Sequence, residues 1–274
     1  MLRFMTAGES HGPQLTAIVS GLPAGLPLRA ADVDRDLKRR QGGYGRGGRM
    51  KIESDTVRFL SGVRHGLAIG SPITLVVENR DWRNWTEIMS PEPVDDPTGV
   101  GRRAITRPRP GHADLPGAQK FGLDDARNVL ERASARATTT QVAIGALCKG
   151  LLAEFGIRVL SHVIEFGPFK IDTAGMTCSQ IAEAAEQSDL RIANPALADA
   201  IRALIDQCKM EGDTLGGIFE VVVTGLPDGL GNVMNWDETL DGKIGQVMLS
   251  MRAIKGGEIG HGCEAARRRG SQVH

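Results

Sequence analysis

The 274-residue chain is long enough to bury a large hydrophobic core in one large domain or two ordinary ones. Hydrophobic residues make up 41% of it, and 33 basic residues balance 33 acidic ones, which argues against a nucleic-acid-binding or membrane-surface protein. Any basic site must therefore be local. The amino terminus lacks a signal-peptide pattern, and no apolar stretch reaches the roughly 18 residues of a membrane span, so we expect a cytoplasmic protein.

The four cysteines predict neither disulfides nor a metal site. They are scattered without a CxxC pair and are interpreted as reduced thiols: Cys148, Cys178, Cys208 and Cys263. The histidines lack the i, i+4 spacing of a zinc-binding helix, so no metal is expected.

The first half of the chain alternates strand-like and helix-like segments around two loops. The pattern predicts a strand at 15–19, a helix at 31–41 with Asp32 as its start signal, a mobile glycine-rich loop at 42–49, strands at 56–63 and 72–78, and an irregular segment at 79–119. An irregular segment that long inside a compact domain is usually functional.

The second half predicts a long helix followed by further alternation. Apolar residues near helical spacing predict one buried helix from Asp124 to about Phe155. After it come a strand at 157–166, helices at 178–187 and 195–210, a strand at 218–224 and a helix near 238–253. Such alternation is typical of α/β or α+β proteins.

The chain contains an internal repeat. The nineteen-residue stretch that starts at Gly8 aligns without gaps to the stretch that starts at Gly212, with shared glycines and a shared Leu-Pro pair. The repeat predicts two copies of a turn–strand–turn–helix unit related by a pseudo-twofold axis. His11 in the first copy is Leu215 in the second, so this histidine is a candidate for chemistry and not for scaffolding. The second copy ends soon after its helix, so we expect the chain to be incomplete at its carboxyl end.

Three arginine clusters predict a local anion site if they converge. They supply Arg39, Arg40, Arg46 and Arg49 from one glycine-rich segment, Arg107 and Arg109 from a proline-rich one, and Arg132 and Arg136 from a helix. A solvated basic surface is an equally good interpretation of each cluster alone. Glycine beside arginine favours phosphate binding, because the backbone can close over the anion, although the segment is not a P-loop.

Two histidines lie in turns and not on apolar helical faces. His11 is in GESHG and His112 is in RPGHAD. Turn histidines are often simply exposed. The arginines near His112 favour a second interpretation, in which a histidine protonates a departing phosphate oxygen as a general acid.

Ordered motifs along the whole chain resemble those of chorismate synthase. The strings are TAGESHGP, RRQGGYGRGGRMKIE, SGVRHG, RPRPGHAD, ERASARAT, GDTLGG, AIKGGEIG and AARRRGSQ. The resemblance implies an α+β fold of the β-α-β sandwich type, a single domain over residues 1–274, and a cytoplasmic homotetramer. It further implies a lyase of the shikimate pathway that forms chorismate by 1,4-anti elimination of phosphate from 5-enolpyruvylshikimate 3-phosphate, with reduced FMN and without net redox change.

The same resemblance implies roles for individual residues. His11 would protonate the leaving phosphate, and His112 would lie beside the flavin and help hold it anionic. The substrate would be bound by Arg40, Arg46, Arg109 and Arg136. The first two of these would also contact NADPH in members that reduce their own flavin. FMN would be contacted by Arg132, Ala133, Ser134, Arg252 and Ala253.

The sequence departs from the family pattern in places. Arg252 stands where Gln is usual, Ala137 where Glu is usual, and His261 where Asp is usual, which bears on local flavin geometry. Family members also continue beyond the equivalent of His274, through a segment with an acid that assists the flavin. The alternative function is therefore an inactive fragment that binds anions or self-associates without turnover. An RNA-binding module is a more distant third, because a single tyrosine does not make a stacking set.

Overall fold

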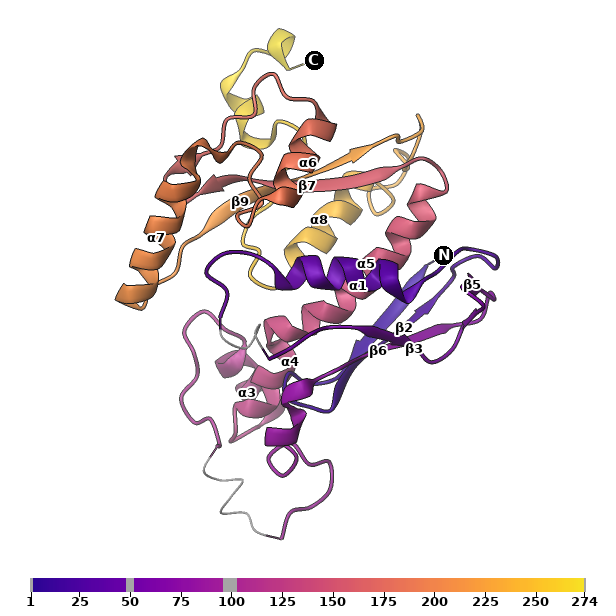
Figure 1. The fold of residues 1–274 in the computed structure, drawn as a ribbon, viewed down its shortest axis with the longest axis vertical. Helices are drawn as coiled ribbons and strands as arrows, with labels where there is room; N and C mark the ends of the chain where they lie inside the picture. Colours follow the sequence, from indigo (N-terminus) through magenta and orange to yellow (C-terminus); the bar gives the residue numbers. More distant parts are fainter. Residues whose placement is uncertain (1, 48–51, 96–102, 274) are drawn as a thin grey trace. The chain divides into compact units, whose positions relative to one another are not determined.

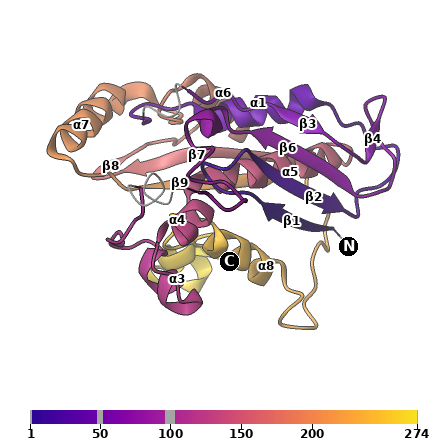
Figure 2. The same ribbon diagram turned by 90° about the horizontal axis from the view of Figure 1, so that it is seen from below.

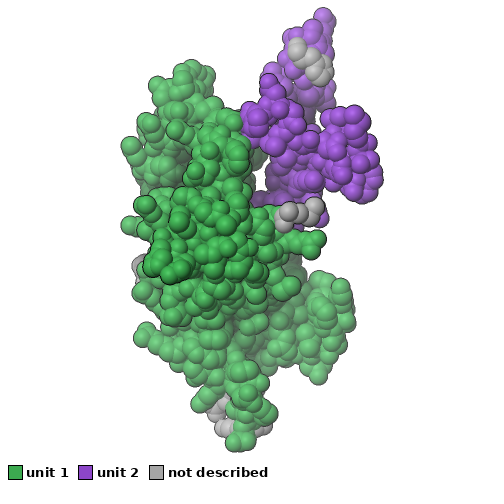
Figure 3. Space-filling view, turned by 90° about the vertical axis from the view of Figure 1, so that its right-hand side faces the viewer, with its two compact units in different colours: residues 1–225 green, residues 226–274 purple. Residues whose placement is uncertain are grey.

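The structure is a computed structural model that describes residues 2–47, 52–95 and 103–273. The chain divides into two compact units, residues 1–225 and 226–274, which Figure 3 colours separately. Among the described residues, no helix combines the length and the apolar character that crossing a membrane requires.

The first unit is built around a four-stranded antiparallel sheet in the order β1-β2-β6-β3. Its strands are β1 (Arg3–Ala7), β2 (Gln14–Ser20), β6 (Ile73–Glu78) and β3 (Val57–Phe59). The side chains of β2 alternate, so that Leu15, Ala17 and Val19 are buried while Ile18 is exposed. This period of two places one face of the sheet on the core. A short ribbon of β4 (Val63–Arg64) and β5 (Leu67–Ala68) extends from it.

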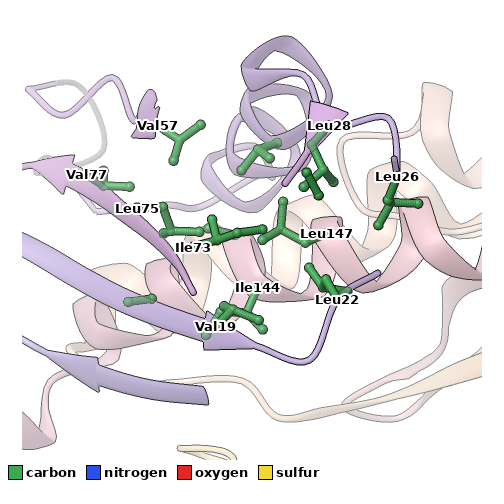
Figure 4. Close-up of a cluster of buried hydrophobic side chains, with 14 of the residues drawn as sticks. Val19, Leu22, Leu26, Leu28, Val57, Ile73, Leu75, Val77, Ile144 and Leu147 are labelled. Atoms are coloured by element: carbon green, nitrogen blue, oxygen red, sulfur yellow. The ribbon is translucent and has the colours of Figure 1, made fainter. Parts of the chain in front are cut away.

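Two helices cover the buried face of this sheet. They are α1 (Ala30–Gln41) and α5 (Thr138–Ala153), which contact each other, and α5 also contacts β1, β2 and β6. Leu37 of α1 and Leu147 of α5 are almost fully buried, together with Leu75 of β6. Figure 4 shows Leu75 and Leu147 among the aliphatic side chains that meet between the strands and the helices, in a cluster to which Leu37 also belongs.

A second antiparallel sheet lies on the other side of α5. It has the order β8-β7-β9, from β7 (Arg158–Phe166), β8 (Phe169–Lys170) and β9 (Gly217–Thr224). Because α5 contacts β7 as well as the first sheet, the layers run sheet, helices, sheet (Figure 1). Two further helices belong to this part, α6 (Cys178–Gln187) and α7 (Ala198–Glu211). The predicted α+β sandwich is confirmed.

The prediction of one continuous helix from Asp124 to about Phe155 is wrong. The segment instead forms α4 (Arg127–Ala133), a short 3-10 turn η3 (Ala135–Ala137) and α5. The break falls at Ser134, whose backbone is extended and whose hydroxyl accepts from the Arg136 amide. A serine that bonds the backbone locally in this way competes with helix. The segment predicted to be irregular at 79–119 contains two regular elements. A 3-10 helix, η2 (Arg80–Asn84), lies near its start, and α3 (Asp114–Phe121) begins before its end.

In the second unit, the described residues 226–273 form one α-helix and two short 3-10 helices. The helix α8 (Leu240–Ser250) begins after Thr239, whose hydroxyl accepts from the Gly242 amide. The 3-10 helices are η5 (Gly262–Arg267) and η6 (Gly270–Gln272).

The repeated stretches share local backbone conformation. Gly8, Gly21 and Gly25 have positive φ, as do their counterparts in the second copy, Gly212, Gly225 and Gly229. The strands β2 and β9 occupy matching places between these glycines. A pseudo-twofold relation between complete units, and the organisation of residues 1–274 as one domain, stay predictions.

Candidate active site

His11 lies in the turn between β1 and β2, and α4 holds it there. Its backbone amide donates to Oε2 of Glu131 at 2.8 Å, and its Nδ1 lies 2.9 Å from each oxygen of that carboxylate. The Ser10 amide donates to the Glu131 carbonyl at 3.0 Å, which ties the turn to the helix a second time. One acidic residue, 120 positions away in the sequence, therefore fixes both the backbone and the ring of His11.

An indole covers one face of the His11 ring. The ring centroids of His11 and Trp85 are 3.9 Å apart with an interplanar angle of 27°, and the His11 side chain is only 18% exposed. Trp85 is itself held by a hydrogen bond of 2.9 Å from its Nε1 to Asp81. The guanidinium groups of Arg103 and Arg127 lie 4.7 and 5.1 Å from its ring centroid. Glu131 thus contacts the edge of the imidazole and Trp85 contacts its face.

Glu131 is fully buried and remains the ionised partner of His11. Burial acts to raise the pKa of its carboxyl, but the hydrogen bonds and positive charge of His11, with a hydrogen bond from Arg127, outweigh burial and lower that pKa. Nη1 of Arg127 lies 3.0 Å from Oε1. An ionised carboxylate only accepts hydrogen bonds, so Nδ1 of His11 carries the proton between them.

The predicted flavin-contact segment 132–134 adjoins the His11 turn. Nη2 of Arg132 donates to both the carbonyl and the hydroxyl of Thr6 at 2.8 Å, and Nη1 donates to the Gly8 carbonyl at 3.4 Å. The hydroxyls of Ser134 and Ser10 lie 3.0 Å apart. Ala133 is the last residue of α4. The segment therefore supports the turn that carries His11.

Two of the predicted substrate arginines meet at one buried carboxylate. Nη1 of Arg136 donates to both oxygens of Asp55, at 2.6 and 2.8 Å, and Nε donates to Asn79 at 2.8 Å. Nη1 of Arg40 lies 3.5 Å from the same carboxylate, and its other nitrogens donate to Thr138 and to the Ala135 carbonyl. The Arg40 side chain is 14% exposed and that of Arg136 only 2%.

The other two predicted substrate arginines have different partners. Arg46 donates from Nε to the Gly42 carbonyl at 3.0 Å and is exposed on the glycine-rich loop. Tyr44 of that loop donates to Asp206 of α7 at 2.7 Å, so the described part of the predicted mobile loop is anchored. Arg49, named in the same sequence cluster, lies outside the described residues. Arg109 pairs with Asp114, so the four arginines do not share one partner.

His112 has its own buried carboxylate at the start of α3. Its Nδ1 is in hydrogen-bond contact with Oδ1 of Asp114, and Nη2 of Arg109 lies 3.1 Å from the imidazole. Asp114 also accepts from the backbone amide and Nε of Arg109. Burial acts to raise the Asp114 pKa, but the hydrogen bonds from Arg109 and His112 lower it below its ordinary value. The helices α3 and α4, which carry the two carboxylates, lie side by side (Figure 2).

The remaining predicted flavin contacts lie in the second unit. Arg252 and Ala253 follow the end of α8, and Ala253 has φ of +70°. A residue with a Cβ rarely adopts this conformation, which costs of order 1–3 kcal/mol and is concentrated at functional sites. Within the described residues no group of three His, Cys, Asp or Glu side chains is arranged to hold a metal ion.

Comparison with known proteins places this site in a family. A family model described as chorismate synthase matches residues 2–274. The chain belongs to the chorismate synthase family. A chorismate synthase of Enterococcus faecalis is 56% identical over 273 residues, covering 99% of this chain and 70% of that protein. One of Shouchella clausii is 55% identical over 275 residues, covering 100% and 70%.

A solved structure supports the same placement. A crystal structure of chorismate synthase superposes with a TM-score of 0.82 at 43% identity, covering all of this chain and 73% of that one. The predicted chorismate synthase function, in aromatic biosynthesis through the shikimate pathway, is confirmed, and the family is one of lyases. These similarities do not favour the alternative of a fragment that only binds anions.

Sequence reasoning missed the partners of both histidines. Glu131, Trp85, Asp114 and Asp55 were not singled out, although the first and third lie inside motif strings. The available signal was positional, because Glu131 precedes the Arg132–Ser134 segment and Asp114 follows His112 by two residues. A single sequence does not show that these acids are buried.

Proposed function

We propose that this chain forms chorismate by 1,4-anti elimination of phosphate from 5-enolpyruvylshikimate 3-phosphate, with His11 as the general acid for the leaving phosphate. The observation that carries the proposal is the clamp on His11. Its Nδ1 is held by Glu131 and its face by Trp85, so the ring has one orientation. A positioned imidazole that is part-exposed is suited to proton transfer at neutral pH.

The arginines would supply the charge that holds the substrate. Arg40, Arg46 and Arg109 each keep a guanidinium at or near the surface, where it can bind phosphate or carboxylate in a bidentate manner. Arg136 is proposed with them, although a direct contact would require it to exchange bonds with Asp55 or Asn79. Arg40 and Arg46 would also meet NADPH if the enzyme reduces its own flavin.

The residues predicted to hold FMN have chemistry that fits an anionic phosphate-bearing cofactor. Arg132 and Ser134 place a guanidinium and a hydroxyl beside the His11 turn, and Ala253 has the strained backbone typical of a ligand contact. Reduced FMN, when bound, supplies the electron-rich partner that the elimination needs. His112, with a proton held between Nδ1 and Asp114, would stabilise negative charge on the bound flavin.

A homotetrameric assembly and a cytoplasmic location are part of the same proposal. They follow from the family resemblance.

The test is a titration of the chain with FMN under reducing, oxygen-free conditions, with and without 5-enolpyruvylshikimate 3-phosphate, followed by an assay of released phosphate. We expect flavin binding that the substrate tightens, and phosphate release that stops when flavin is omitted. His11→Ala should leave both binding events intact while turnover falls by about 10²–10⁴, as for a lost general acid. Flavin and substrate binding without turnover in the wild-type chain would support the inactive alternative instead.

A further inference from the structure

The contacts of His11 go beyond what a turn histidine needs for stability. Its ring nitrogen Nδ1 and its backbone amide are both bonded to one fully buried carboxylate, and its face lies against an indole. Burying an ionised carboxylate is costly unless it is fully bonded. This arrangement would be a poor way to anchor a loop, but it fixes which ring nitrogen carries the proton.

We propose that Glu131 is the positioning residue of His11, holding the Nδ1–H tautomer so that Nε2 is the atom that delivers the proton, with Trp85 fixing the plane of the ring. This inference rests on the proposed role of His11 as the acid. Glu131 acts through His11 and is not itself assigned any contact with substrate.

The proton balance follows from the hydrogen bonds. In the imidazolium form both nitrogens carry a proton, and Nδ1–H donates to Glu131. Breaking the carbon–oxygen bond of the substrate leaves its electron pair on the phosphate oxygen, which takes the proton from Nε2. The product imidazole keeps Nδ1–H, which is the tautomer that Glu131 stabilises. No proton has to pass to Glu131, because the hydrogen bonds from His11 and Arg127 lower the pKa of that carboxyl in spite of its burial and keep it ionised.

The charges around His11 come from two segments. Glu131 and Arg127 of α4 are opposite in sign and bonded to each other, and Arg103 reaches Trp85 from the preceding loop. Arg127 also lies over Trp85. Arg127 therefore contacts both the carboxylate and the indole, and the Glu131 carboxylate contacts the imidazole directly.

Besides His112 and Asp114, the chain contains a further histidine–carboxylate pair, whose geometry is opposite to that of His11 and which serves as an internal control. His162 on β7 contacts Glu220 on β9 through Nε2, at 2.9 Å, and its buried Nδ1 has no hydrogen-bond partner. His162 is therefore expected in the Nε2–H tautomer, and His11 in the Nδ1–H tautomer. Both pairs occur in one molecule, so both are measured in one sample under identical conditions.

The test begins with nitrogen NMR of the chain labelled with ¹⁵N-histidine, with assignments from His11→Gln and His162→Gln. Above neutral pH we expect His11 to give the pattern of a protonated Nδ1 and a bare Nε2, and His162 the reverse. Glu131→Gln places an amide group against Nδ1, and the His11 pattern should change while that of His162 does not. An Nε2–H pattern for His11 in the wild-type chain would overturn the proposal, and this measurement does not depend on turnover.

The kinetic arm separates positioning from support. Glu131→Gln should lower kcat by about 10- to 100-fold, less than the loss on removing the acid itself, with little change in KM. The alkaline limb of its pH–rate profile should move to lower pH, because the neighbouring negative charge is gone. Glu131→Asp should recover part of kcat and restore the limb, and Glu220→Gln should leave both kcat and the profile unchanged.

Outcomes that contradict the proposal are distinct from failure of the proposed function. If Glu131→Gln loses activity only in proportion to its loss of folded protein, with an unmoved pH limb, Glu131 is a structural residue. If Trp85→Phe, which keeps an aromatic face, retains kcat while Glu131→Gln does not, the carboxylate acts without the indole. Should the wild-type chain show the predicted tautomer but no turnover, positioning stands and the proposed reaction fails.

Discussion

The Arg136 guanidinium donates from a single nitrogen to both oxygens of Asp55, at 2.6 and 2.8 Å, in a pair whose side chains are 2% and 0% exposed. Arg40 approaches the same carboxylate from the end of α1 at 3.5 Å. The pair thus connects the helix layer to the segment that precedes β3. A buried pair of this kind is costly to break, because removing one member leaves the other charge without compensation.

We therefore expect Asp55→Asn to lower the free energy of unfolding by about 3–5 kcal/mol. Urea unfolding at neutral pH measures it. The matched control is Arg58→Gln, which removes an ion pair with Glu78 whose side chains are 61% and 66% exposed, and which should cost no more than about 1 kcal/mol. Similar losses in the two variants would show that Asp55 does not neutralise a buried charge.

The buried carboxylates predict loss of stability in acid. The pKa values of Asp114 and Glu131 are lowered from ordinary values of 3.8 and 4.5. A carboxyl with a lower pKa in the folded chain contributes stability that is fully present above its unfolded pKa and is lost as pH falls through the folded one. The unfolding free energy should therefore drop below about pH 4.5.

Urea unfolding at several pH values between neutrality and pH 3 tests this dependence. Asp114→Asn should be less stable than the wild-type chain at neutral pH and should lose less on acidification, because it has no carboxylate to protonate. Asp199→Asn is the control, since that side chain is 99% exposed, and its curve should run parallel to the wild type. An Asp114→Asn curve that also runs parallel would contradict the assignment.

The strands, and the position of His11 in a turn, could be predicted from the sequence, whereas the residues that contact His11 and Arg136 could not. The apolar runs that form β2 and β7 are local in the sequence, and a histidine in a glycine-rich turn is conspicuous in one sequence. The contact between His11 and Glu131 spans 120 positions, and that between Arg136 and Asp55 spans 81. No local pattern reports such contacts, because a buried glutamate on a helix has the same sequence signature as a solvated one.

The break in the long helix illustrates the same limit. Apolar periodicity continues through Ser134, and helix propensity alone would carry α4 into α5. Two hydrogen bonds of the Ser134 hydroxyl compete with helix formation, a local one from the Arg136 amide and a tertiary one with Ser10 in the His11 turn. The helix is therefore interrupted at the residue that contacts the His11 turn.

Two glycines of the first repeat copy should differ in how strongly substitution by alanine destabilises the fold. Gly8 has φ of +105°, and a Cβ there would lie 2.5 Å from the Gln14 carbonyl oxygen, whereas Gly25 has φ of +84° and open space. Gly25→Ala should cost about 1–2 kcal/mol for the left-handed backbone alone. Gly8→Ala should cost about 3–5 kcal/mol, because overpacking adds to that strain. Thermal unfolding compares them, and equal costs would refute the role of the close contact.

Substitution of two neighbouring arginines at the end of α1 should affect substrate binding to very different extents. The Arg40 side chain contacts Thr138, the Ala135 carbonyl and Asp55. The Arg39 side chain instead contacts Ser161 at 2.7 Å and Glu186 at 2.9 Å. Only Arg40 is proposed to bind the substrate anion. Calorimetric titration with 5-enolpyruvylshikimate 3-phosphate measures the two variants directly.

Arg40→Ala should weaken substrate binding by roughly 10- to 100-fold, the effect of losing a hydrogen bond to a charged group, while Arg39→Ala should change it less than about threefold. Arg40→Lys keeps the charge without the planar fork and should fall between them. Because Arg40 also neutralises Asp55, the unfolding midpoint of each variant is measured beside its affinity. If the loss of affinity follows the unfolding midpoint across all three variants, Arg40 has a structural role and does not bind the substrate. If the Arg39 and Arg40 variants lose equal affinity, binding depends on general positive charge and not on a specific anion site.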